Sequence, residues 1–139
     1  MKFLKIIVAG LSLLAYQNVH SQSMADEAIY ELRTYTSNEG KFEAMNNRFR
    51  DHTIALFDKH GLESMGYWIP VDKKNTLIYI LKHKSLDGAK EAWKNFANDP
   101  EWKKVAEESG RNGPILAERP QSQFMSATDY SKGMPAGRN

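Results

Sequence analysis

Hydrophobic and polar residues are distributed along the chain in a pattern that predicts four strands separated by helices. Strands are indicated where aromatic and β-branched residues alternate with polar ones, as in the run Ile-Tyr-Glu-Leu-Arg-Thr-Tyr-Thr. The predicted strands cover residues 29–36, 62–69 and 76–82, and a last one lies within 115–127. The short polar connection between the second and third strands favours an antiparallel hairpin.

Apolar residues at helical spacing indicate two helical regions. The first covers residues 41–60 and is followed by Gly61, at the position where glycine typically ends a helix. The second begins at Ser85, is interrupted at Asp99-Pro100 and continues to Gly110. The order is therefore β-α-β-β-α-β. This order predicts an α+β, ferredoxin-like fold: one four-stranded antiparallel sheet with the helices on one face.

Such a sheet has a second face that its own helices leave open. Successive side chains of a strand point to opposite faces, so the first strand divides into two sets. One set is Tyr30, Leu32 and Thr34, and the other is Glu31, Arg33 and Tyr35. If the helices cover the Leu32 face, the open face carries the second set. Because those side chains are aromatic or charged, we expect two copies to pair face to face, as a homodimeric α+β barrel with a semi-polar interior.

The N-terminus has the layout of an export signal. Lys2 and Lys5 precede an apolar run, and Val19 and Ser21 suit the −3 and −1 positions of a cleavage site. The apolar run is about half the roughly 20 residues that a spanning helix needs, so we expect cleavage after Ser21, no membrane anchor afterwards, and a periplasmic or secreted protein. A buried N-terminal helix is the alternative. The predicted organisation is a signal at 1–21, a polar lead at 22–27, a domain at 28–131 and a flexible tail at 132–139.

Cleavage changes the charge balance of the chain. It removes two of the 19 basic residues and none of the 17 acidic ones, which leaves a formally neutral protein. A neutral domain gives no support for a nucleic-acid partner. The chain also has no cysteine, which excludes disulfides, redox dithiols, thiolate metal sites and lipid attachment through cysteine.

Common catalytic motifs are absent. The sequence has no glycine-rich nucleotide loop, no P-loop, no H-E-x-x-H and no nucleophile elbow. His52 and His60 lie on one predicted helix, about 12 Å apart along its axis at 1.5 Å per residue. They cannot both bind one metal ion directly. We therefore expect no metal site and no bound cofactor.

His52 is one candidate for chemistry because it continues the spacing of an apolar stripe. The stripe runs through Phe42, Met45, Phe49, His52 and Leu56. Two interpretations remain open. His52 is either a core histidine bonded to a carbonyl or a tyrosine, or a base or hydrogen-bond donor that lines a pocket.

Arg33 is the second candidate, since a guanidinium inside a strand is costly unless it is paired. Glu31, on the same face, is the nearest partner. The pair is either a structural ion pair at a subunit interface or part of an anion clamp inside the barrel. Aromatic residues are either core residues or the lining of a ligand cavity. The candidate ligand-binding set is Glu31, Arg33, Tyr35, Tyr67, Trp68 and Tyr79.

Several segments, in order and spacing, resemble the NIPSNAP family. They are residues 29–35, Arg50-Asp51-His52-Thr53, His60-Gly61, Gly66-Tyr67-Trp68, Ser85-Leu86, Asp99-Pro100-Glu101-Trp102, Phe124-Met125 and Thr128-Asp129-Tyr130-Ser131. The resemblance covers residues 28–131 and implies a dimeric α+β barrel, but it implies no particular reaction. Related barrels include cofactor-free monooxygenases of aromatic substrates and haem-binding enzymes. The chain lacks the proximal-histidine context of the haem users.

Three functions stay open at this point. The leading hypothesis is a homodimer that binds a small aromatic or amphipathic molecule in the barrel. The alternative is a cofactor-independent monooxygenase or isomerase, with His52 as the base and Arg33 holding an oxyanion. A structural or interaction module is the third.

Overall fold

The structure is a computed structural model that describes residues 28–134. Its strands are β1 (Ile29–Thr36), β2 (Glu63–Trp68), β3 (Thr76–His83) and β4 (Gln121–Ser126). Its helices are α1 (Phe42–Arg48), a π-helical segment (Phe49–Thr53), α2 (Ile54–Lys59), α3 (Leu86–Asn98) and α4 (Pro100–Gly110). The predicted signal (1–21), the polar lead (22–27) and the last five residues of the tail lie outside the described residues. Those assignments stay predictions.

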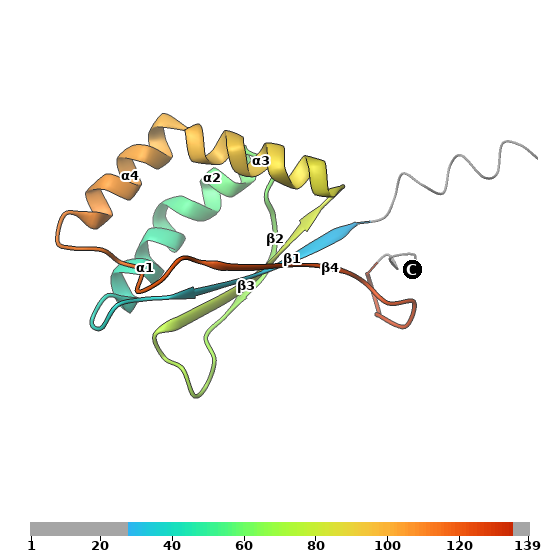
Figure 1. The fold of residues 1–139 in the computed structure, drawn as a ribbon, viewed down its shortest axis with the longest axis horizontal. Helices are drawn as coiled ribbons and strands as arrows, with labels where there is room; N and C mark the ends of the chain where they lie inside the picture. The colour runs from blue at the N-terminus through green and yellow to red at the C-terminus, as the bar shows by residue number, and fades with distance from the viewer. Residues whose placement is uncertain (1–27, 135–139) are drawn as a thin grey trace, which may run out of the picture.

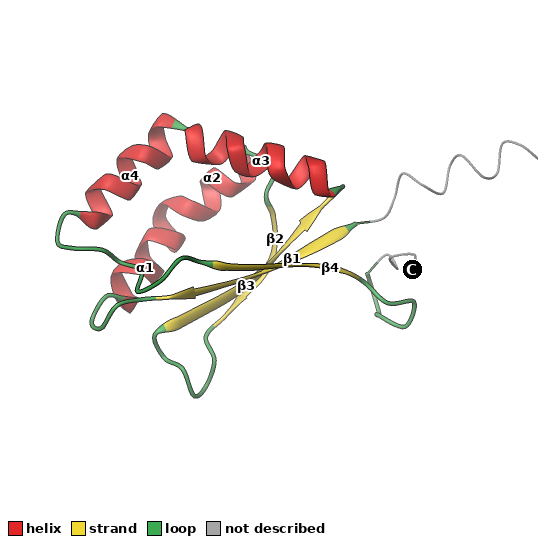
Figure 2. Ribbon diagram, in the orientation of Figure 1, coloured by secondary structure: helices red, strands yellow, loops and turns green. Residues whose placement is uncertain are grey.

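The four strands form one antiparallel sheet in the order β2-β3-β1-β4. All helices lie on one side of it (Figures 1 and 2). This confirms the predicted ferredoxin-like α+β fold. In the single chain the sheet is open, with β2 and β4 at its edges. None of the helices within residues 28–134 is long and apolar enough to cross a membrane.

Local sequence explains where the helices begin and end. Ser85 precedes α3, and its hydroxyl accepts a hydrogen bond from the backbone N–H of Gly88 (3.0 Å). Asp99 caps α4 in the same way, through the N–H of Glu101 (2.7 Å), and Pro100 occupies the first turn, where its missing N–H costs nothing. Gly61 ends the first helical region with a φ of +72°, a conformation that glycine adopts readily. The predicted helix boundaries are thereby confirmed.

The first helical region contains one turn that the spacing argument did not predict. Phe49–Thr53 is π-helical, and the N–H of Ile54 donates to the carbonyl of Phe49, five residues back. The wider turn places Thr53 on the buried face, where it is 2% exposed, and leaves His52 exposed on the outside. The predicted position of His52 on the buried stripe is therefore wrong. Placing it there assumed 3.6 residues in every turn.

The sheet also faces the opposite way from the expected arrangement. The Tyr35 ring packs under the helices, 5.5 Å from Phe49 and 5.4 Å from Tyr79 between ring centroids. Glu31 contacts Trp93 of α3. Glu31, Arg33 and Tyr35 thus lie on the helix-covered face, and Leu32 lies on the open one. The expectation was wrong because partners from distant segments satisfy both charges beneath the helices.

An aromatic core fills the space between the helices and the sheet. Tyr79 is fully buried at its centre, with Phe49 and Phe57 of the first helical region against it, and Phe96 of α3 packs on Phe57. The core consists of Tyr35, Met45, Phe49, Leu56, Phe57, Leu62, Leu77, Tyr79, Leu81, Phe96 and Ile115. This packing holds α3 above the end of β3, where the chain forms a cavity.

Candidate functional site

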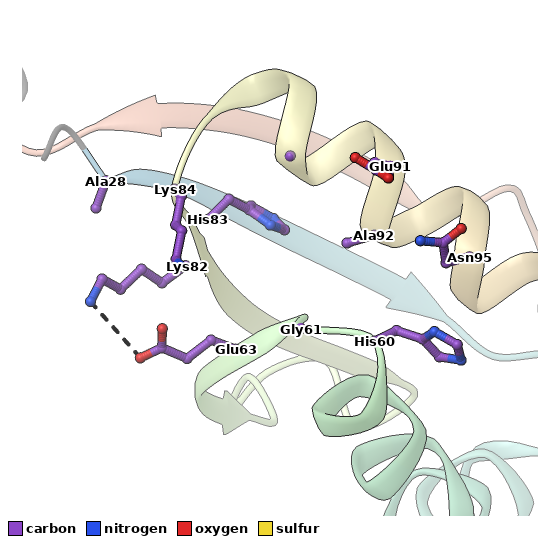
Figure 3. A pocket seen from close by; sticks show the side chains of 11 residues that line it. Ala28, His60, Gly61, Glu63, Lys82, His83, Lys84, Glu91, Ala92 and Asn95 are labelled. Carbon is purple, nitrogen blue, oxygen red and sulfur yellow. Dashed lines mark ion pairs between the residues drawn. The ribbon is translucent and has the colours of Figure 1, made fainter. Parts of the chain in front are cut away.

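A cavity of about 890 Å³ lies at the end of the sheet where β3 leads into α3. Figure 3 shows α3 on one side of it and the turn between α2 and β2 on the other. Its walls come from four segments: Ala28, the turn residues His60 and Gly61 with Glu63 at the start of β2, the strand end Lys82, His83 and Lys84, and Gly88, Glu91, Ala92 and Asn95 of α3. The volume lies within the range of ligand-binding pockets.

His83 is the most buried ionisable residue of this wall, with 5% of its surface exposed. Its Nε2 lies 2.9 Å from Oε2 of Glu31, which is 1% exposed. A carboxylate only accepts hydrogen bonds, so Nε2 carries the hydrogen and donates it. No group in the described part of the chain bonds to the other ring nitrogen, Nδ1. The carboxylate therefore fixes the ring through Nε2 and leaves Nδ1 of this cavity-lining residue without a protein partner in residues 28–134.

The Glu31 carboxylate accepts four hydrogen bonds from side chains. Oε1 accepts from Arg33 Nη1 (3.1 Å) and from Ser122 Oγ (2.6 Å). Oε2 accepts from His83 and from Trp93 Nε1 (2.7 Å). The donors come from β1, β3, β4 and α3, so this one carboxylate connects three strands and a helix.

The pKa of Glu31 shows that these contacts outweigh the cost of burial. Burial by itself raises the pKa of a carboxyl group. Hydrogen bonds from His83, Ser122 and Trp93, together with the charge of Arg33, lower it to about 2. Glu31 is consequently ionised at any pH near neutrality, which stabilises the donating orientation of His83.

Arg33 supplies the matching positive charge. Besides its bond to Glu31, its Nη2 donates to Tyr35 Oη (3.2 Å), and its guanidinium lies 4.5 Å from the centre of the Trp93 ring. Burial lowers the pKa of Arg33, but neighbouring Tyr35, Tyr79 and Glu31 raise it above its ordinary value overall. Both terminal nitrogens of Arg33 are thus bonded within the protein, whereas its buried Nε has no partner in the described residues.

A second histidine–carboxylate pair stands at the border of the cavity. His60 Nε2 donates to Asp99 Oδ2 (2.6 Å), and Lys59 Nζ lies 2.8 Å from the same oxygen. Hydrogen bonds from Lys59, then His60, hold the pKa of Asp99 well below its usual range. The His60 ring turns away from His83 in Figure 3. We read this pair as a connection between the end of α2 and the α3–α4 junction.

The structure gathers five of the seven residues that the sequence singled out. Those under the helices are Glu31, Arg33, Tyr35, Tyr67 and Tyr79. Trp68 lies on the opposite face of the sheet, half exposed, with its ring across Gly66. His52 lines a separate groove of about 250 Å³ between the first helical region and α4.

The candidate set lacked three residues that complete the site: His83, Trp93 and Ser122. For His83 a signal was present, because it continues the alternation Leu77, Tyr79, Leu81 on the buried side of β3. Trp93 and Ser122 gave no comparable signal, since they meet Glu31 across 62 and 91 residues of chain. Within residues 28–134, no three histidine, aspartate or glutamate side chains come together as a metal-ion site would require.

Comparison with known proteins identifies the family of this chain. The sequence matches no curated protein. A NIPSNAP family protein of unknown function from Agrobacterium tumefaciens is 25% identical, with a TM-score of 0.67 over 78% of this chain and 95% of that one. An uncharacterised NIPSNAP-like domain protein from Burkholderia xenovorans is 18% identical, with a TM-score of 0.67 over 81% and 96%.

The same fold extends to a further group of proteins. A candidate antibiotic biosynthesis monooxygenase from Caulobacter crescentus is 16% identical, with a TM-score of 0.53 over 79% of this chain and 99% of that one. At this identity the likeness concerns the fold alone. The family model named NIPSNAP matches residues 30–132, which is most of the chain and nearly all of its described part. The chain belongs to the NIPSNAP family.

Proposed function

We propose that this protein is a homodimer that binds a small, partly apolar molecule in the cavity beside His83. One observation carries the proposal: a buried histidine faces an 890 Å³ cavity with one nitrogen held by an ionised carboxylate and the other without a partner in the described chain. The cavity therefore replaces the barrel interior as the proposed ligand site.

The unbonded Nδ1 of His83 determines which hydrogen-bonding group the ligand places against it. In a neutral imidazole whose Nε2 carries the hydrogen, Nδ1 is a hydrogen-bond acceptor. The matching ligand group is a donor, such as a phenol, an enol or an alcohol. Ala28, Gly61 and Ala92 line the cavity with little bulk, which leaves room for a planar ring. A small hydroxylated aromatic molecule meets both conditions.

Nitrogen NMR of the histidines tests this directly. Phenol should shift the Nδ1 resonance of His83, whereas anisole, the methyl ether with no O–H, should not. His83→Gln should abolish phenol binding, and the matched variant His52→Gln, in the separate groove, should retain it. Near-ultraviolet circular dichroism would show whether each variant keeps its aromatic packing. Equal shifts from phenol and anisole, or loss of binding only in His52→Gln, would refute the proposed site.

The second subunit is proposed to cover the open face of the sheet. We call this surface the open face and define it by Leu32, Ile78, Ile80, Trp68 and Met125. These five residues are apolar, Lys82, Gln121 and Gln123 share the face with them, and Trp68 is 51% exposed in the single chain. An apolar surface of this kind typically marks an interface. A second copy fits because a symmetric pair buries the same surface on both subunits.

A catalytic role is the second candidate, and the His83–Glu31 pair is the observation that favours it. A histidine oriented by a carboxylate is an arrangement used for general bases. His83 Nδ1 would take the proton of a bound enol or of a carbon acid, and Glu31 would stabilise the resulting imidazolium. The geometry thus favours His83 as the base in place of His52, in a cofactor-independent isomerase or monooxygenase.

Solvent exchange separates catalysis from binding. With a carbon acid such as acetylacetone in deuterium oxide, the wild type should speed deuterium incorporation and His83→Gln should not, while His52→Gln should match the wild type. Identical exchange in all three proteins would leave binding as the function and remove the catalytic candidate.

We also propose that the protein is exported, on the support of Lys2, Lys5 and the apolar run that follows them. N-terminal sequencing of the protein from its native host should begin at Gln22. A sequence that begins at Met1 would contradict export with cleavage.

A further inference from the structure

We infer that the ligand is an acid: an anionic group of the ligand, such as a carboxylate, lies against Lys84 while its hydroxyl group donates to His83. The inference rests on the proposed function and adds the chemical class of the ligand. It comes from the arrangement of charge around the cavity.

Some of the charged residues that border the cavity form ion pairs, and others have no partner in the described residues. Lys82 Nζ lies 3.9 Å from Glu63 Oε1, so these two charges largely offset each other. Lys84 forms no ion pair within the described residues. Glu91 is the other charge without a partner there, and it belongs to α3. Figure 3 shows Lys84 beside Lys82 at the strand end and Glu91 farther along the helix, so the two free charges border different parts of the cavity.

The position of Lys84 connects it to the proposed contact. Lys84 follows His83 directly in the chain, so both side chains begin at the same end of the cavity. A ligand whose hydroxyl group reaches the buried Nδ1 must extend outward toward the solvent-exposed border. Its far end then comes within reach of the long Lys84 side chain, which forms no ion pair within residues 28–134. His60 does not compete for an anion there, because it is bonded to Asp99 and turned away from His83.

The expected contribution is modest and sensitive to salt. Ion pairs at exposed positions change an equilibrium constant about two- to fivefold. Their strength falls as ionic strength rises, because the screening length shortens. Both properties can be measured, and neither is expected of the hydrogen bond to the buried His83.

Three probes separate the two ends of the ligand: phenol, benzoate and 4-hydroxybenzoate, titrated into the purified protein by NMR. We expect 4-hydroxybenzoate to bind about two- to fivefold more tightly than phenol in 20 mM salt, and the advantage to shrink in 300 mM salt. Lys84→Gln should remove the advantage without changing the affinity for phenol. Lys90→Gln is the matched control, since Lys90 lies on α3, pairs with Asp87 and does not line the cavity.

The outcomes distinguish this inference from the proposal on which it rests. If phenol shifts His83 but 4-hydroxybenzoate binds no better, or keeps its advantage in Lys84→Gln, the inference is wrong and the cavity remains a binding site. An equal loss in Lys84→Gln and Lys90→Gln would also refute it. If none of the probes shifts the His83 resonance, the proposed function itself fails.

Discussion

The two faces of the sheet differ in the side chains they carry: charged groups bonded within the chain on the covered face, and apolar groups at the centre of the open face. Beneath the helices, β1 carries a carboxylate, a guanidinium and a phenol, and each finds a partner there. On the open face the same strand carries Leu32, and β3 adds Ile78 and Ile80, whose side chains have no hydrogen-bonding groups. The availability of hydrogen-bond partners, more than exposure to solvent, therefore determines on which face a charged side chain lies. The covered face is polar because most of its polar groups find partners there, although the Tyr79 hydroxyl and Arg33 Nε have none in the described residues.

The largest expected effect comes from removing the charge that organises the covered face. Glu31→Gln should lower the free energy of unfolding by about 3 kcal/mol, because it leaves Arg33 as an uncompensated, largely buried charge. Urea denaturation measures this. The matched control is Glu39→Gln at an exposed turn, which should change stability by less than about 0.5 kcal/mol. A loss below about 1 kcal/mol in Glu31→Gln would mean that the charge network contributes little.

Acid should weaken the covered face through the same residue. The pKa of Glu31 falls from 4.5 to about 2 on folding. Its contribution is therefore complete above about pH 5 and is lost as the pH falls toward 2, by up to about 3 kcal/mol. Urea midpoints at pH 6, 4 and 3 should drop more steeply for the wild type than for Glu31→Gln. Asp99, whose pKa is also lowered, should account for the slope that remains. Parallel curves for the two proteins would contradict this.

The open face should respond mainly in association. Leu32→Asp places two like charges at the proposed symmetric interface, which should weaken the dimer by at least about 2 kcal/mol, or about thirtyfold. Sedimentation velocity at several concentrations measures it. Ala55→Asp, on the exposed side of α2, introduces the same charge as a control. If the wild type is monomeric, or if both variants associate equally, the open face is not the interface.

The smallest effects distinguish two tyrosines of the covered face. Tyr35→Phe should cost about 1.5 kcal/mol, because Arg33 Nη2 loses its acceptor. Tyr79→Phe should cost nothing or stabilise slightly, since the buried Tyr79 hydroxyl has no partner within residues 28–134. The two variants remove the same atom from neighbouring rings. Equal losses in thermal unfolding would show that the hydroxyl environments do not differ as described.

The elements of the fold could be predicted because their signals are local. β1 was predicted at its observed bounds, and the breaks at Gly61 and Asp99-Pro100 lie where the helices end or restart. These signals depend on backbone preferences of neighbouring residues, which the sequence displays directly. The order of elements then restricts the sheet topology to few alternatives.

The candidate site was only partly predictable, for two physical reasons. β1 has large apolar side chains on both faces, so periodicity could not choose between the Leu32 face and the Tyr35 face as the one that the helices cover. The partners that offset the cost of burying Glu31, including His83 at 52 residues' separation, meet it only in the folded chain. His52 was misplaced because nothing in its neighbours signals a wider turn.

The wider turn also matters for how relatives should be aligned. The Ile54–Phe49 hydrogen bond takes up one residue more than a regular helix would, while Met45 before it and Leu56 after it both stay in the core. A relative with an uninterrupted α-helix would need one residue fewer to keep both ends in place. Its alignment with this chain should therefore carry a single gap within residues 49–53. Without that gap, positions on one side of the turn would be matched to positions one residue, or about 100°, farther around the helix.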